Sequence, residues 1–172
     1  ITARKLAENA LARKDKILST VAASVSSLLE SLEFETVIPN ILGKIGIVVE
    51  AGRCYIFQNS HDKVNNQLLS SQVFEWCAEG IEPQIDNPDL QNIPFNDLFP
   101  RWVELLSRKE PVVGLVKDFP EFERSILEPQ SIQSLLVLPV SVNNSLWGFI
   151  GFDEVNTPRE WSKEEIAILS LV

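Results

Sequence analysis

The chain has 172 residues, 45% of them hydrophobic, which suits one domain of roughly 100–150 residues with an extension and a full apolar core. Its 24 acidic and 15 basic side chains give a net charge of −9, and such a surface repels phosphate backbones and anionic lipids, which argues against nucleic-acid and membrane-surface binding. There is no signal peptide, no run of the ~20 apolar residues that a membrane span needs, and too few cysteines for a secreted disulfide scaffold, so we expect a cytoplasmic protein in which Cys54 and Cys77 are free thiols.

The first predicted element is a helix that reaches to about residue 32 and contains no proline or glycine. Apolar residues recur along it at alternating spacings of three and four, a heptad pattern that is typical of coiled coils. The pattern predicts that residues 1–32 are a connector through which two chains dimerise. The alternative is that this helix lies back on its own domain. The candidate interface residues are Leu11, Leu18, Val21, Val25, Leu28 and Leu32.

A second helix is predicted over about residues 35–51, because its apolar residues share one face. Pro39 falls in the first turn, where a helix tolerates proline. Gly43 and Gly46 lie in the interior, where each costs about 1 kcal/mol relative to alanine. These two glycines therefore indicate close packing of the helix backbone against a sheet.

Two strands follow, at residues 53–57 and 68–78, and read as an antiparallel pair. Period-two alternation places Phe74 and Trp76 on one face of the second strand. The segment 79–100 holds four prolines and is unusually long for a connection, which is typical of a lid. Its apolar residues predict that it packs on the domain.

A short helix near residues 99–106, a strand at 112–118 and another short helix at 120–129 come next. Residues 134–152 then predict a hairpin, because Asn143 and Asn144 accept the positive φ angles of a type I′ turn. In that register Leu138 faces Phe149. Both faces of the hairpin are apolar, so it should lie centrally in the sheet, with helices on one face and further helices and a pocket on the other.

The tail combines five acidic residues with two tryptophans in "SLWGFIGFDEVNTPREWSKEEIAIL". Ser162 and Glu165 have the spacing of a capping box, which predicts the start of the last helix. Asp153 and Glu154 are interpreted as the end of a strand and its turn. The sequence contains no HExxH, GxSxG, P-loop or CxxC pattern, so we predict neither a catalytic residue nor a metal site.

The passage "SLLVLPVSVNNSLWGFIGFDEVNTPREWSKEEIAILSLV" resembles the C-terminal half of a GAF domain. "EWCAEGIEPQIDNPDLQN" and "RWVELLSRKEPVVGLVKDFPEFER" are similar to GAF domains of multidomain bacterial sensor proteins. The resemblance covers about residues 33–172, with the final helix truncated. It implies an α/β (α+β) fold: a central antiparallel sheet of five or six strands, terminal helices on one face, and short helices with the long loop over a small-molecule pocket on the other.

The resemblance also implies a function in signal transduction. Such domains stand beside PAS and histidine-kinase modules in two-component phosphorelay proteins, and their terminal helices pass the ligand state to an output domain. The chain begins with Ile1, so we expect a segment of a longer protein. We also expect that this segment is not an enzyme and that it is part of a homodimer. Two other hypotheses stay open: a ligand-free dimerisation scaffold, and a GAF module of a diguanylate cyclase or transcription regulator.

The ligand is not predicted. Neither cysteine has the setting of a bilin attachment site or of a methionine-sulfoxide reductase, and the NKFDE-like signature of cyclic-nucleotide-binding GAF domains is absent, so we expect no covalent cofactor. Arg101 and Asp118 are the candidate polar anchors of the pocket. Each aromatic candidate is also a typical core residue. The candidate ligand-binding residues are Phe74, Trp76, Phe95, Arg101, Trp102, Leu115, Asp118, Phe119 and Phe149.

Overall fold

The computed structural model describes residues 2–30 and 33–172. Its α-helices are α1 (Ala3–Glu30), α2 (Phe34–Val48), α3 (Phe95–Leu98), α4 (Pro100–Ser107), α5 (Glu121–Leu127) and α6 (Lys163–Leu169). Short 3-10 helices are η1 (Pro88–Leu90), η2 (Val116–Asp118) and η3 (Glu128–Gln130). The strands are β1 (Arg53–His61), β2 (Leu68–Cys77), β3 (Ile93–Pro94), β4 (Val112–Leu115), β5 (Ser134–Val142) and β6 (Ser145–Glu154).

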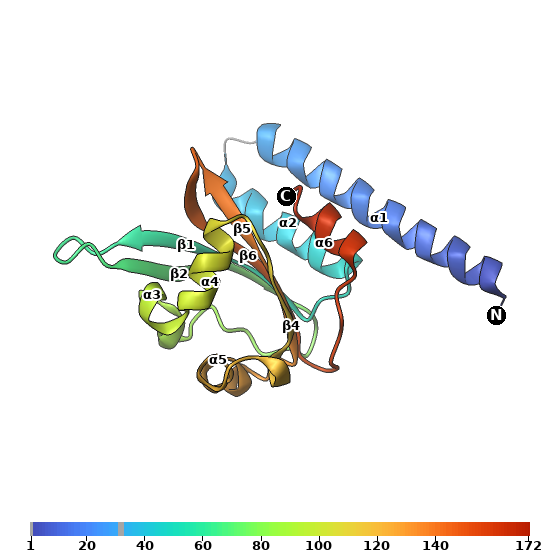
Figure 1. Ribbon diagram of the computed structural model, residues 1–172. Helices are drawn as coiled ribbons and strands as arrows, with labels where there is room; N and C mark the ends of the chain where they lie inside the picture. Colours follow the sequence, from blue (N-terminus) through green and yellow to red (C-terminus); the bar gives the residue numbers. More distant parts are fainter. Residues whose placement is uncertain (1, 31–32) are drawn as a thin grey trace.

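Within the described residues the strands form one six-stranded sheet in the order β3-β2-β1-β6-β5-β4, and every neighbouring pair is antiparallel. Helices α1, α2 and α6 cover one face, and α3, α4 and α5 lie on the other (Figure 1). Each face of the sheet has its own apolar core. The predicted α+β architecture and the central position of the hairpin are confirmed. In the part of the chain described, no helix has both the length and the apolar character that crossing a membrane requires.

The glycines of α2 pack against the sheet as predicted. A Cβ atom on Gly46 would lie 2.4 Å from Cε3 of Trp76, and one on Gly43 would lie 3.1 Å from Cδ1 of the same ring. Real Cβ atoms essentially never approach as closely as 2.4 Å, and 3.1 Å is tighter than most real contacts, so the indole of Trp76 occupies the space that the glycines leave open.

Helix α1 uses part of the predicted dimer interface inside its own chain. Val21 is 1% exposed, and Val25 and Leu28 pack, partly buried, against the same core. That core includes residues of α2 and α6, whose apolar surfaces cover these side chains within one chain. The C-terminal half of α1 therefore lies back on its own domain, as the alternative interpretation had it.

The part of α1 before Val21 leaves two residues of the predicted interface exposed. Leu11 is 61% exposed and Leu18 is 43% exposed. Figure 1 shows the N-terminal part of the helix running past α6. Leu32 lies outside the described residues. The predicted interface is thus divided: Val21, Val25 and Leu28 are covered within the chain, whereas Leu11 and Leu18 are available to a partner.

The hairpin has the predicted turn but not the predicted register. Asn143 and Asn144 have φ angles of 51° and 63°, as a type I′ turn requires. A bulge between Val140 and Ser141 then shifts the pairing, so that Leu138 faces Ile150 and not Phe149. Because a one-residue shift moves side chains to the opposite face, the bulge turns Phe149 away from the α2 side and into the other core.

The tail forms the predicted helix start. Ser162 Oγ accepts from the Glu165 backbone N–H at 3.1 Å, and Glu165 Oε1 accepts from the Ser162 N–H at 3.4 Å, which completes the capping box. Asp153 and Glu154 do end strand β6. The side chain of Asp153 nevertheless differs from the expectation, because it is buried in the interior and not in a surface turn.

Candidate functional site

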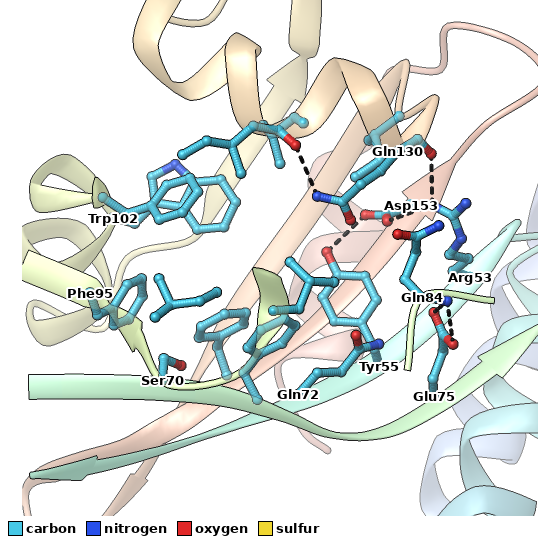
Figure 2. A pocket seen from close by; sticks show the side chains of 18 residues that line it. Arg53, Tyr55, Ser70, Gln72, Glu75, Gln84, Phe95, Trp102, Gln130 and Asp153 are labelled. Carbon is cyan, nitrogen blue, oxygen red and sulfur yellow. Dashed lines mark hydrogen bonds and ion pairs between the residues drawn. The ribbon is translucent and has the colours of Figure 1, made fainter. Parts of the chain in front are cut away.

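A cavity of about 40 Å³ lies between the sheet and the layer that contains α3, α4 and α5 (Figure 2). Strands β1, β2 and β6 form its floor, and the long segment after β2 together with α4, α5 and η3 forms its cover. The floor residues are Arg53, Tyr55, Phe57, Ser70, Gln72, Glu75, Phe149 and Asp153. The cover residues are Gln84, Leu90, Ile93, Phe95, Phe99, Trp102, Ile126, Leu127, Gln130 and Ile132.

Aromatic rings build one end of the cavity, around Phe149. Phe57 stacks on Phe149 with ring centroids 4.7 Å apart and nearly parallel planes. The centroid of Phe95 lies 5.5 Å from that of Phe149, and the ring of Trp102 lies 6.2 Å from it in a near-perpendicular arrangement. Aromatic pairs at these separations are stabilising beyond the area that they bury. The cluster joins α3 and α4 to the centre of the sheet.

Charged and polar side chains build the other end, as Figure 2 shows for Arg53, Tyr55 and Asp153. Tyr55 Oη donates to Asp153 Oδ1 at 2.8 Å, and Arg53 Nη1 lies 3.7 Å from Asp153 Oδ2. Arg53 also donates from Nε to the Glu82 carbonyl and from Nη1 to the Gln130 carbonyl, both at 3.0 Å. All three side chains are buried. One guanidinium therefore ties both parts of the cover to the sheet.

The polar end of the cavity contains a carboxyl group that changes its protonation state near neutral pH. Burial raises the pKa of Asp153 from 3.8 to about 7, against the opposing effects of the Tyr55 hydrogen bond and the Arg53 charge. Burial likewise raises the pKa of Tyr55, so its hydroxyl stays protonated and donates. Asp153 is thus the group at this site whose charge changes around pH 7.

The cover is held down by polar contacts with strand β2. Both carboxylate oxygens of Glu75 accept from the backbone N–H of Gln84, and one of them also accepts from that of Ile85, at 2.9–3.0 Å. Gln91 Nε2 donates to the Gln72 carbonyl at 2.9 Å. Strand β3, which lies within this segment, extends the sheet beside β2. The prediction that segment 79–100 packs on the domain is confirmed, although β3 was not foreseen.

Two polar atoms in the cavity wall have no hydrogen-bond partner within the described residues. They are Ser70 Oγ and Gln72 Oε1, both on β2. A buried polar atom left without a partner costs about 1–3 kcal/mol. The protein itself therefore leaves part of the hydrogen-bonding capacity of this wall unmet.

Of the nine predicted ligand-binding residues, the structure brings Phe95, Trp102 and Phe149 together in this cavity. Phe74 and Trp76 share a face as expected, but that face packs against the helix layer on the other side of the sheet. The physical reason is the alternation of β2, which turns Glu75 to the cavity and both its neighbours away from it.

The other four predicted residues lie around a separate surface hollow beside strand β4. They are Arg101, Leu115, Asp118 and Phe119. The Arg101 guanidinium forms an ion pair with Glu123 at 2.5 Å and lies 5.0 Å from the centroid of the Phe119 ring, so it braces α4 against α5. Asp118 is exposed. Leu115, Asp118 and Phe119 do not reach the cavity because β4 is the edge strand farthest from β2, and Arg101 instead pairs with Glu123.

Sequence reasoning missed the polar wall of the cavity, namely Arg53, Tyr55, Ser70, Gln72, Glu75 and Asp153. A signal existed for two of them. Arg53 and Asp153 are charged residues inside apolar strands, and such residues are rarely buried unless they are paired. The sheet face on which the other four residues lie could not be predicted from simple alternation, because the pairing of β1 with β2 changes register between Ile56 and Phe57. Among the described residues no cluster of His, Cys, Asp and Glu has the geometry to hold a metal ion.

Comparison with known proteins identifies relatives of the whole chain. The family model of the GAF domain matches residues 33–172. The methanogenesis regulatory histidine kinase FilI of Methanothrix harundinacea (strain 6Ac) is 44% identical over 171 residues. That match covers 99% of this chain but 19% of the kinase, so the chain spans about a fifth of the length of this relative.

Solved structures share the fold. The blue-light-absorbing form of the PixJ GAF domain from Thermosynechococcus elongatus matches with a TM-score of 0.65 at 19% identity, over 82% of this chain and 83% of that one. The phycocyanobilin-bound GAF domain of a cyanobacterial phytochrome matches with a TM-score of 0.69 at 18% identity, over 89% and 87% of the two chains. At such identities the likeness concerns the fold alone.

Proposed function

Since this chain belongs to the GAF domain family, we propose that it is the sensory module of a larger cytoplasmic signalling protein of the histidine-kinase type and that it binds a small molecule. The GAF domain is itself a non-catalytic module, so this segment reports the presence of a molecule and does not transform it. The observation that carries the proposal is the cavity, in which a buried ion pair and two unpartnered polar atoms face an aromatic cluster.

The relatives support the same proposal from two sides. FilI is named as a regulatory histidine kinase, and one structural neighbour is named as bound to phycocyanobilin. Neighbouring PAS or kinase domains in a two-component phosphorelay would then receive the signal. Helices α1 and α6, which lie side by side on the face of the sheet opposite the cavity, are the elements that would pass it on (Figure 1).

A test of ligand binding compares the mass of the purified chain under native and denaturing conditions. We expect the native protein to retain a non-protein mass of a few hundred daltons, or to be stabilised by at least one compound in a broad thermal-shift screen. Equal masses in both conditions together with no stabilising compound would contradict the sensory function.

A second candidate function is a ligand-free dimerisation scaffold. The observation that favours it is the size of the cavity, since about 40 Å³ is small beside the ~300–1,000 Å³ of typical ligand pockets. A ligand must therefore displace part of the cover, or the aromatic cluster simply fills the site. The mass comparison separates these two functions.

The dimer is proposed to form through the exposed half of α1. Leu11 and Leu18 lie seven residues apart and continue the heptad pattern, and both are exposed. Replacing both with glutamate should convert a dimer to a monomer in sedimentation, because it places charges in the apolar seam. The matched control is Ala12→Glu with Ser19→Glu, which adds the same charge one position away and should leave the dimer intact. A wild-type chain that sediments as a monomer at all concentrations would overturn the dimer.

A further inference from the structure

The two unpartnered polar atoms of the cavity come from neighbouring positions on one strand face. Ser70 is 1% exposed and Gln72 is 4% exposed, and both line the cavity from β2. The backbone carbonyl of Gln72 is already bound by Gln91 Nε2, so the unmet capacity belongs to the side chains. Buried polar atoms nearly always have a partner, and here the cavity is the space from which one can come.

The charged groups of the same cavity are, in contrast, paired within the protein. Among the described lining residues Arg53 is the one cationic side chain, and it is held by Asp153 and by two backbone carbonyls. The Glu75 carboxylate accepts backbone N–H groups of the cover, and Asp153 accepts from Tyr55. A charged ligand would have to break one of these pairs. The hydrogen-bonding groups of the cavity that remain without a partner, on Ser70 and Gln72, are therefore uncharged.

The shape of the cavity favours a flat molecule. The rings of Phe95, Trp102 and Phe149 pack around one end of it with centroids 5.5–6.2 Å apart. Planar faces of this kind complement a planar ring. A volume of about 40 Å³ is far below the ~300–1,000 Å³ of typical ligand pockets, which favours a small molecule.

From these observations we propose that the cavity takes an uncharged planar ring compound with an N–H donor and a carbonyl acceptor side by side, as in a cyclic amide. Its N–H would donate to Gln72 Oε1 and its carbonyl would accept from Ser70 Oγ. Serine hydroxyl and glutamine amide groups each offer a donor and an acceptor, so the two roles can also be exchanged. The inference rests on the proposed ligand-binding function and adds the chemical class of the ligand.

The test uses 2-pyridone as the probe, titrated into the isotopically labelled chain and followed by amide chemical shifts. Three comparison probes each remove a feature of it: N-methyl-2-pyridone lacks the N–H, benzene lacks both polar groups, and benzoate is an anion. We expect 2-pyridone to shift the amide signals of β2 and to bind at least tenfold more tightly than each of the other probes.

Two variants locate the contact. Gln72→Leu should weaken the binding of 2-pyridone at least tenfold without lowering the melting temperature, because it also removes an unpartnered buried atom. Gln58→Leu is the control on the neighbouring strand, where the side chain is exposed, and should leave binding unchanged. Ser70→Ala should weaken binding in the same direction as Gln72→Leu.

The outcomes separate the ligand class from the function. If benzene or benzoate binds in the cavity as tightly as 2-pyridone, or if Gln72→Leu leaves the affinity for 2-pyridone unchanged, the chemical class is wrong although the cavity still binds ligands. If none of the four probes shifts a cavity signal, the chemical class is wrong, and the comparison of native and denatured masses decides separately whether the cavity binds a ligand.

Discussion

Replacing Arg53 with methionine should lower the free energy of unfolding by about 3–5 kcal/mol at pH 8, because it leaves a buried carboxylate without its cation. Methionine keeps much of the aliphatic stem and removes the guanidinium. Asp153 then retains the hydrogen bond from Tyr55 but loses the ion pair. The carbonyls of Glu82 and Gln130 lose their donor as well. Chemical denaturation measures the change.

The cost of this substitution should fall as the pH is lowered. The folded-state pKa of Asp153, about 7, is above its ordinary value of 3.8, so the unfolded chain releases this proton first as the pH rises. The contribution of Asp153 to stability is therefore greatest at low pH, declines between about pH 4 and 7, and is constant above that range. Without Arg53 the pKa rises further, so the decline extends to higher pH and the variant loses less at pH 5 than at pH 8.

Two further variants test whether the cost of Arg53→Met comes from the lost ion pair with Asp153. Asp153→Asn removes the titrating group, so the difference in stability between the wild type and this variant should change from pH 4 to 7 and be constant at higher pH. Arg124→Met breaks an exposed ion pair with Glu128, at 2.8 Å, and should cost no more than about 1 kcal/mol. The account is wrong if Arg53→Met costs no more than Arg124→Met, or costs the same at both pH values.

Phe149→Ala should cost about 3–5 kcal/mol of unfolding free energy, because it empties the centre of the aromatic cluster. Phe149 is 4% exposed and contacts the rings of Phe57, Phe95 and Trp102. The control is Phe122→Ala on α5, where the ring is 53% exposed and the change should stay within about 0.5 kcal/mol. Denaturant melts of both variants give the comparison.

The same variant should also enlarge the cavity. Benzene should then raise the melting temperature of Phe149→Ala and leave that of Phe122→Ala unchanged, because an apolar cavity binds apolar molecules of matching size. Equal losses of stability in the two variants would show that Phe149 does not hold the cluster together.

Local rules of the sequence predicted the parts of the fold that local contacts build. The capping box of Ser162 and Glu165 and the turn at Asn143-Asn144 each depend on residues within four positions of one another, and both are confirmed. The close packing at Gly46 was also predicted, because a glycine inside a helix has a cost that only tight packing explains.

The cavity could not be predicted in the same way, because its polar end joins residues about a hundred positions apart. Arg53 and Asp153 meet because β1 pairs with β6, and no local pattern specifies that pairing. Phe149 faces the cavity only because of the bulge at Val140. The heptad pattern of α1 could not show what covers its apolar residues, because a second chain and the same chain can bury such a stripe equally well. In the structure, Val21 is covered by its own domain.

Strand β6 carries the cavity and the helix layer on consecutive residues. Asp153 faces the cavity, whereas the ring of Phe152 packs 5.9 Å from that of Trp161, the residue directly before the N-cap of α6. A single peptide unit therefore separates the polar end of the cavity from the ring contact that lies beside the start of the last helix. A molecule that rotated this strand about its own axis would move both side chains together, and it could do so only if it bound the rotated strand more tightly than the unrotated one.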